Sequence, residues 1–100
     1  KDINAACNTI KKGEISGTYS KSIDLLEKNF AKYNKTKYAV SVSSGTTALH
    51  LAIACLNLRN GSEVLVSTTT NIATGLAITH NNLIPKFIDS KIDTWNISTV

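Results

Sequence analysis

The stretch Ser41-Val-Ser-Ser-Gly-Thr-Thr-Ala-Leu-His50 governs how the rest of the chain is interpreted. Residues 37–42 form a short run that is rich in β-forming residues, whereas residues 48–58 are apolar on nearly every side. This change of pattern predicts a strand, a tight turn and a helix. We expect Gly45 to let the backbone turn without a Cβ clash, and Ser44 or Thr46 to cap the helix.

A helix that starts in this way suits an anion. Its first backbone N–H groups have no partner within the helix, and the helix dipole adds a partial positive charge there. With the hydroxyl groups of Ser44, Thr46 and Thr47, these donors predict a phosphate site. The same residues are also ordinary helix-capping residues, so the turn alone leaves both readings open. The glycine fingerprint of dinucleotide-binding folds and the P-loop are both absent from the sequence.

Strands and helices alternate along the rest of the chain. Helical spacing of apolar residues predicts helices over residues 2–12 and from Ser20 or Ser22 to Tyr33, and residues 37–100 follow as strand–helix units. We expect strands at 62–67 and 83–89 and a helix at 72–81, which together give an α/β fold with a parallel sheet. Because the carboxyl ends of parallel strands share one edge, the polar turns 43–47 and 67–71 should converge there. Residues 1–100 are predicted to be a single partial domain, divided into an N-terminal helical part (1–36) and the strand–helix units (37–100).

Length and composition bound the class of protein. The chain has 100 residues, 42% of them hydrophobic, which fits one small globular domain or a piece of a larger one. It has no membrane-length apolar run and no signal-like N-terminus, so we expect no membrane partner. Methionine is absent, so we expect a fragment of a longer protein. Cys7 and Cys55 lack metal-ligand spacing, which predicts no metal site and a reducing, cytoplasmic setting.

The net charge of +4 comes entirely from residues 1–37, where eight lysines face four acidic residues. A basic segment of this kind could contact nucleic acid. The lysines alternate with acids at helical spacing, however, which favours a solvated helix face and makes a nucleic-acid partner unlikely. His50 and His80 have no acid or nucleophile at a suggestive spacing, so a packing or surface role is favoured over catalysis.

The order of these segments resembles a known family. The run from Tyr38 to Ala52 is similar to the pyridoxal-phosphate-dependent sugar aminotransferases of the DegT/StrS family. The runs at 60–66, 70–74, 84–89 and 93–97 follow in the family's order, and residues 13–17 and 26–33 resemble its first loop and the helix after it. The resemblance covers essentially the whole chain.

The resemblance implies the N-terminal portion of the large domain of a fold-type I pyridoxal-phosphate-dependent transferase. It also implies a homodimer, and amino transfer from glutamate to a nucleotide-linked keto sugar for cell-surface polysaccharide or amino-sugar biosynthesis. Carried over by position, the cofactor-binding residues are Ser44, Gly45 and Thr46 at the phosphate of pyridoxal 5'-phosphate and Asn71 against its ring. Gly17 and Thr18 would border the sugar site.

The resemblance also places the Schiff-base lysine beyond residue 100. We therefore expect no catalytic residue in this chain, and we expect the 100 residues alone to be inactive. Two alternatives stay open: a related sugar dehydratase that uses the same cofactor, and a non-enzymatic fragment that binds a phosphate ligand or dimerises. A parallel sheet of this size buries little surface, which predicts self-association or marginal stability.

Overall fold

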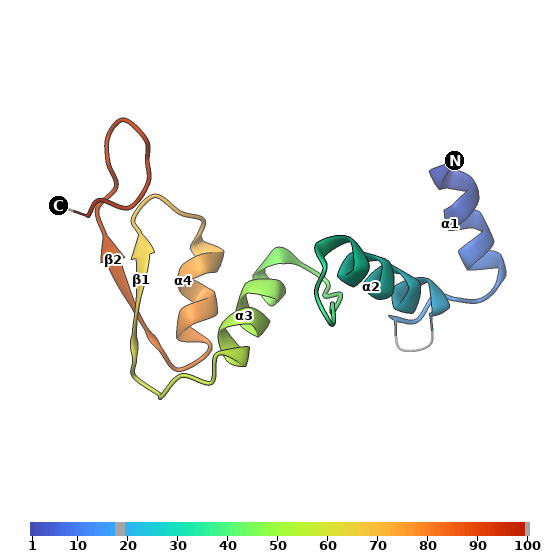
Figure 1. Ribbon diagram of the computed structural model, residues 1–100, viewed down its shortest axis with the longest axis horizontal. Coiled ribbons are helices and arrows are strands. Elements are labelled where there is room, and N and C mark those ends of the chain that lie inside the picture. Colours follow the sequence, from blue (N-terminus) through green and yellow to red (C-terminus); the bar gives the residue numbers. More distant parts are fainter. Residues whose placement is uncertain (18–19, 100) are drawn as a thin grey trace. The chain divides into compact units, whose positions relative to one another are not determined.

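The computed structural model describes residues 1–17 and 20–99. The described residues form the elements labelled in Figure 1: α1 (Asp2–Lys11), α2 (Lys21–Asn34), α3 (Gly45–Cys55), β1 (Glu63–Ser67), α4 (Ile72–Thr79) and β2 (Ile84–Ile88). The chain separates into two compact units, Lys1–Ser41 and Val42–Val100. The assignment of residues 1–100 to one domain stays a prediction.

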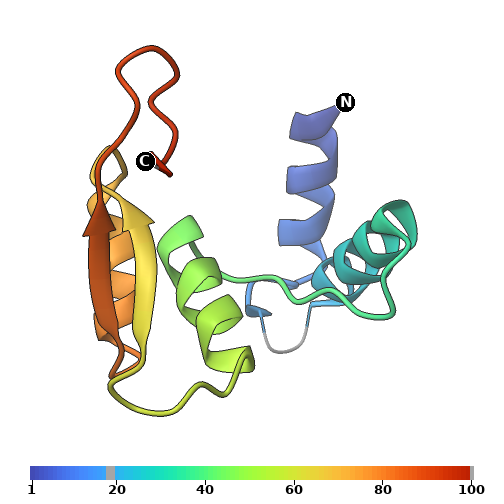
Figure 2. The same ribbon diagram turned by 60° about the vertical axis from the view of Figure 1, so that its left-hand side comes forward.

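The second unit is built on a parallel pair of strands. β1 and β2 pair in parallel, with Glu63 opposite Ile84 and Ser67 opposite Ile88. α4 connects the two strands and lies against one face of the pair, and α3 packs beside α4 (Figure 2). The core consists of buried apolar side chains from β1, α4 and the turn after α4, with partly buried side chains packed on them: Val66, Ile78, Leu83, Ile53 and Val64. The predicted α/β fold with a parallel sheet is confirmed.

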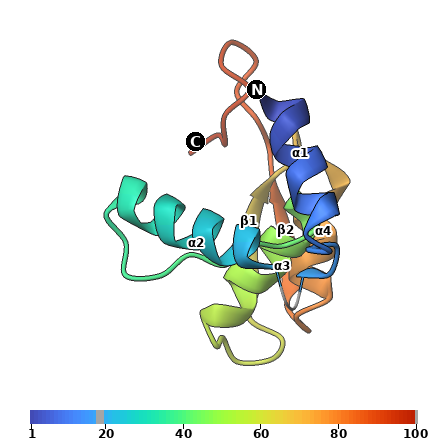
Figure 3. The same ribbon diagram turned by 90° about the vertical axis from the view of Figure 1, so that its right-hand side faces the viewer.

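The first unit contains α1 and α2, joined by a loop (Figure 3). Gly13 adopts φ 71° just after α1, a left-handed conformation that is common where a helix stops. The first turn of α2 is held by Glu14, whose Oε2 accepts from the backbone N–H of Ser22 at 3.3 Å and from its hydroxyl at 2.9 Å. α2 begins directly after Ser20, one of the two predicted cap positions, although its side chain makes no capping bond.

The prediction of a strand over residues 37–42 is wrong. These residues form neither helix nor strand, and Tyr38 and Val40 are largely exposed. Their backbone groups bond to side chains instead of to a neighbouring strand. The Thr36 hydroxyl donates to the Tyr38 carbonyl at 3.0 Å, and the Ser41 N–H donates to Glu27 at 2.7 Å. No described strand lies beside this segment to complete a ladder.

Two helices end earlier than the apolar pattern predicts. α3 ends at Cys55 rather than near residue 58, because Asn57 takes the left-handed conformation with φ 48°. α4 ends at Thr79 rather than at residue 81, and Asn82 is left-handed with φ 56°. Gly61, just before β1, is also left-handed, with φ 80°. Within the described residues, none of the helices has both the length and the apolar character that a bilayer crossing requires.

Candidate functional site

The starts of α3 and α4 lie at one end of the second unit. In Figures 1 and 2 both helices begin at the end where β1 and β2 finish. The polar turns 43–47 and 67–71 therefore share this end, as predicted, although only the second of them follows a strand. In α/β folds this is the end at which ligands bind.

Ser44 organises the start of α3. It is the N-cap residue, with an extended backbone, and its Oγ accepts from the Thr47 N–H at 3.2 Å. The two hydroxyl groups of this pair lie 2.9 Å apart, and the Ser44 carbonyl accepts from the Ala48 N–H at 3.0 Å. The Ser44 side chain thus holds the turn in place, and the predicted capping role is confirmed.

The next two residues present free donors. Among the residues that the structure describes, none accepts a hydrogen bond from the backbone N–H of Gly45 or Thr46. The first turn of α3 also carries no acidic side chain that would repel an anion. Two parallel N–H groups, a positive dipole end and exposed hydroxyl groups form a donor set that suits a phosphate.

The structure corrects the reason given for Gly45. This residue has no positive φ, since Gly13 and Gly61 are the glycines with that conformation in the described chain. A Cβ built on Gly45 would meet nothing within 4 Å. The turn therefore does not need a glycine for its own geometry. The glycine leaves open space at the first residue of α3.

Asn71 has a defined structural role. It is the N-cap residue of α4, and its Oδ1 accepts from the Ala73 N–H at 3.0 Å. Beside it the hydroxyl groups of Thr70 and Thr74 lie 2.9 Å apart. Asn71 also lines a shallow groove of about 420 Å³ together with side chains of α4 and β2. The contact of Asn71 with a cofactor ring stays a prediction. The capping bond holds the side-chain amide plane of Asn71, which is the group that would contact the ring.

Of the two predicted sugar-site residues, only Gly17 is among the residues that the structure describes. Gly17 belongs to the first unit, where a Cβ on it would lie 3.5 Å from Cδ1 of Ile23. Thr18 falls outside the described residues. Ser44, Gly45, Thr46 and Asn71 all belong to the second unit.

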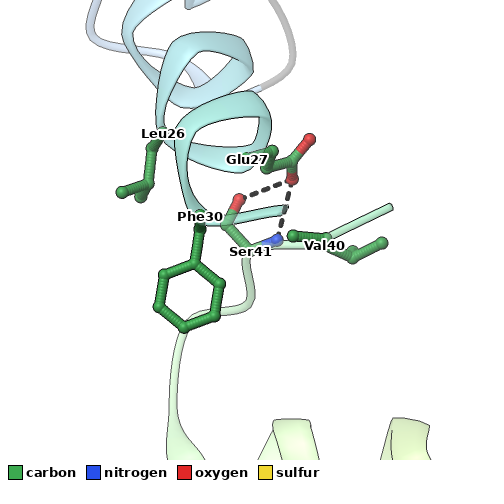
Figure 4. Close-up of a pocket in the computed structure, with 6 residues that line it drawn as sticks. Leu26, Glu27, Phe30, Val40 and Ser41 are labelled. Atoms are coloured by element: carbon green, nitrogen blue, oxygen red, sulfur yellow. Dashed lines mark hydrogen bonds between the residues drawn. The ribbon is translucent and has the colours of Figure 1, made fainter. Parts of the chain in front are cut away.

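One polar contact was missed by the sequence analysis. Glu27 on α2 accepts two hydrogen bonds from Ser41 with the same Oε1 atom (Figure 4). These bonds, the backbone one first, lower the pKa of the Glu27 carboxyl from its ordinary value. The pair lies in a small pocket of about 240 Å³ lined otherwise by apolar side chains, Leu26, Phe30, Ala39 and Val40. No local pattern signals a contact between residues fourteen positions apart.

Lys86 of β2 forms an ion pair with the neighbouring strand. Nζ of Lys86 lies 3.4 Å from Oε1 of Glu63 on the neighbouring strand, and both side chains are 56% exposed. An ion pair this exposed contributes little to stability. Lys86 therefore stands in a surface pair.

The arrangement is that of an α/β unit with a phosphate-type donor set at a helix start, and the comparisons with known proteins specify the class. The sequence profile of the DegT/DnrJ/EryC1/StrS aminotransferase family matches residues 1–100, and the chain belongs to this family. It is 45% identical over 76 residues to GDP-perosamine synthase of Escherichia coli O157:H7, which covers 76% of the chain and 21% of that protein. It is 36% identical over 99 residues to dTDP-3-amino-3,6-dideoxy-alpha-D-galactopyranose transaminase of Aneurinibacillus thermoaerophilus. This match covers 97% of the chain and 26% of that protein.

A solved structure agrees with this assignment. GDP-4-keto-6-deoxy-D-mannose-3-dehydratase of E. coli, with bound hydrated pyridoxal phosphate, superposes with a TM-score of 0.84 at 31% identity. The match covers 96% of this chain and 26% of that one. The fold is thus that of part of a fold-type I pyridoxal-phosphate-dependent transferase. The chain spans about a fifth to a quarter of the length of these relatives.

Pyridoxal phosphate is the cofactor of this family. The residues at the start of α3 fit its phosphate group on three counts: two free N–H groups, no acidic side chain in the first turn, and no Cβ in front of the helix.

Proposed function

We propose that the protein containing this chain is a pyridoxal-phosphate-dependent aminotransferase that acts on a nucleotide-linked keto sugar, and that this chain supplies part of its cofactor site. One observation carries the proposal. The residues matched to the aminotransferase family over the whole chain include the start of α3, where Gly45 and Thr46 present free N–H groups.

Each residue assigned to the site has a separate task. The N–H groups of Gly45 and Thr46 bind the cofactor phosphate, and Ser44 fixes the turn that aims them. Asn71 lies against the cofactor ring while its Oδ1 caps α4. Gly17 and Thr18 border the sugar. When bound, pyridoxal phosphate supplies the electron sink that amino transfer requires.

The partners follow from the same proposal. The amino donor is glutamate, the acceptor is a keto group on a nucleotide-linked sugar, and the whole protein works as a cytoplasmic homodimer. The names of the relatives, a GDP-perosamine synthase and a dTDP-amino-sugar transaminase, support the substrate class. A spore coat polysaccharide biosynthesis protein of Bacillus subtilis, 33% identical over 100 residues, supports a role in polysaccharide synthesis.

The test uses the protein that contains this stretch. With pyridoxal phosphate bound, it should absorb at about 400 nm. It should also convert glutamate to 2-oxoglutarate in the presence of a nucleotide-linked keto sugar. Both signals should vanish when the Schiff-base lysine is replaced, and glutamate turnover without a sugar acceptor would contradict the substrate class.

A related dehydratase is the second candidate, because a dehydratase is among the solved structures that the chain resembles closely. In that case the position of the Schiff-base lysine would hold another residue, and the sugar product would carry no new amino group. Mass spectrometry of the product separates the two reactions.

The 100 residues alone are proposed to be inactive, because the Schiff-base lysine is expected outside them. This statement is tested by assaying the isolated chain beside the whole protein under identical conditions. Measurable amino transfer by the isolated chain would overturn it.

A further inference from the structure

Two histidine side chains that are thirty positions apart in the sequence meet in the second unit. His50 lies on α3, and His80 is the residue that ends α4. Their ring centroids are 5.9 Å apart, and the ring planes are tilted by 59°. His50 is half-buried and His80 is exposed, so the pair is open to solvent on one side.

The backbone that carries the two rings is held firmly. Nδ2 of Asn81 donates to the carbonyl of His50 at 3.1 Å and to that of Ala77 at 2.8 Å, which ties the end of α4 to the middle of α3. The same two helices also meet in the core, where Ile53 of α3 packs against the cluster that contains the fully buried Ile78 of α4. Packed and hydrogen-bonded elements of this kind give their side chains a fixed spacing.

The spacing matches two imidazoles that share one metal ion. A Zn–N bond is about 2.0–2.1 Å long, and a ring nitrogen lies about 1.1 Å from the ring centre, so each centroid lies about 3.2 Å from the metal. Two such rings are about 5.2 Å apart at a tetrahedral angle and about 6.4 Å apart when they lie on opposite sides of the metal. The separation of 5.9 Å falls between these limits.

We propose that His50 and His80 form a two-histidine binding site for a divalent transition metal, with Zn²⁺ as the test ion. The described residues hold no group of three or more histidine, cysteine, aspartate or glutamate side chains that could take an ion. Water therefore completes the coordination, and the site is open rather than a closed four-ligand structural site. The metal joins the middle of α3, where His50 lies, to the end of α4, where His80 lies.

The experiment is a calorimetric titration of the chain with Zn²⁺. Cys7 and Cys55 are free and exposed, so both are first replaced by serine to remove competing thiolates. The expected result is one ion per chain, with an affinity that falls by about tenfold or more in both His50→Asn and His80→Asn, since even the loss of an outer-shell partner costs this much. A His80→Cys variant should recover binding, because a thiolate is also a zinc ligand.

Two controls separate a loss of metal binding from a loss of folding or a non-specific effect. Circular dichroism of each variant shows whether its helices remain, and Arg59→Gln on the loop after α3 serves as a surface control that should bind Zn²⁺ unchanged. Failure of the starting protein to bind Zn²⁺ saturably would mean that the two rings make an aromatic contact only. Equal affinity in His80→Asn would also overturn the proposal.

Discussion

Oε1 of Glu27 accepts two hydrogen bonds from Ser41, one from the backbone N–H at 2.7 Å and one from the hydroxyl at 2.9 Å. This contact anchors the segment after α2 onto that helix within the first unit. It also takes up the Ser41 N–H that a strand over residues 37–42 would have paired with a neighbouring strand. The sequence signal for a strand and the observed structure differ because a tertiary partner claims this donor.

The Glu27 contact should weaken in acid. Its carboxyl has a lowered pKa in the folded chain, so the unfolded chain binds the proton more readily. The stabilisation is therefore complete above the unfolded value, about 4.3 for glutamate in peptides, and is lost as pH falls through the lower folded value. Hydrogen exchange followed by NMR should show the protection factor of the Ser41 amide falling over this range.

A Glu27→Gln variant provides the control for this pH dependence. Glutamine can still accept from Ser41 but does not titrate, so the variant should show lower protection at neutral pH and no acid-dependent step. A Ser41 protection factor that changes equally with pH in both proteins would contradict the assigned cause.

Ser44 should separate helix capping from phosphate binding. Replacing it by alanine removes the acceptor for the Thr47 N–H and should cost about 1 kcal/mol of helix stability. Replacing it by aspartate keeps a good cap but places a negative charge at the phosphate site. Thermal unfolding should therefore distinguish Ser44→Ala from the parent, whereas pyridoxamine phosphate binding should be most reduced in Ser44→Asp. Unchanged binding in Ser44→Asp would argue against a phosphate at this helix start.

Gly45→Ala should leave the fold intact and harm only the site. The backbone at this position suits any residue, and a Cβ meets nothing within 4 Å, so the variant should be equally stable or more stable by up to about 1 kcal/mol. The added methyl group occupies the space in front of the free N–H groups and should weaken phosphate binding.

Gly75→Ala on α4 is the matched control for this substitution. Its Cβ would lie 3.7 Å from Cζ of Phe87, an ordinary contact, and Gly75 is the fourth residue of α4, outside the start of α3. It should show the same stability change as Gly45→Ala without the loss of binding. Equal binding by the two variants would show that the space before α3 is not used.

The isolated chain should self-associate or unfold at low concentration. Few of its described side chains are buried, and large apolar ones remain exposed on helices and strands alike, among them Phe30, Leu56, Leu65, Ile72 and Phe87. Each strand also pairs on one side only. Sedimentation velocity at several concentrations checks this prediction, and a stable monomer at every concentration would disprove it.

Local signals in the sequence were sufficient for much of the second unit. Apolar runs bounded by Asn60-Gly61 and Asn82 locate β1 and β2, and Ser44 marks the start of α3 by its capping chemistry. The free N–H groups at the start of α3 follow from any helix that begins there, whereas the binding of a phosphate to them stays a prediction. The contacts Glu27–Ser41 and His50–His80 could not be predicted in this way, since each joins elements whose packing is a property of the folded chain.

The central claim is that the start of α3 binds the phosphate of the cofactor. The most direct measurement is an NMR titration of the ¹⁵N-labelled protein that contains this chain with pyridoxamine 5'-phosphate, which has no aldehyde to react with lysines, and with pyridoxamine as the control that lacks the phosphate. Phosphate binding at this helix start predicts saturable shifts of the Gly45 and Thr46 amides with the phosphate compound alone. If these amides stay unmoved, or respond equally to pyridoxamine, the phosphate does not bind at the start of α3.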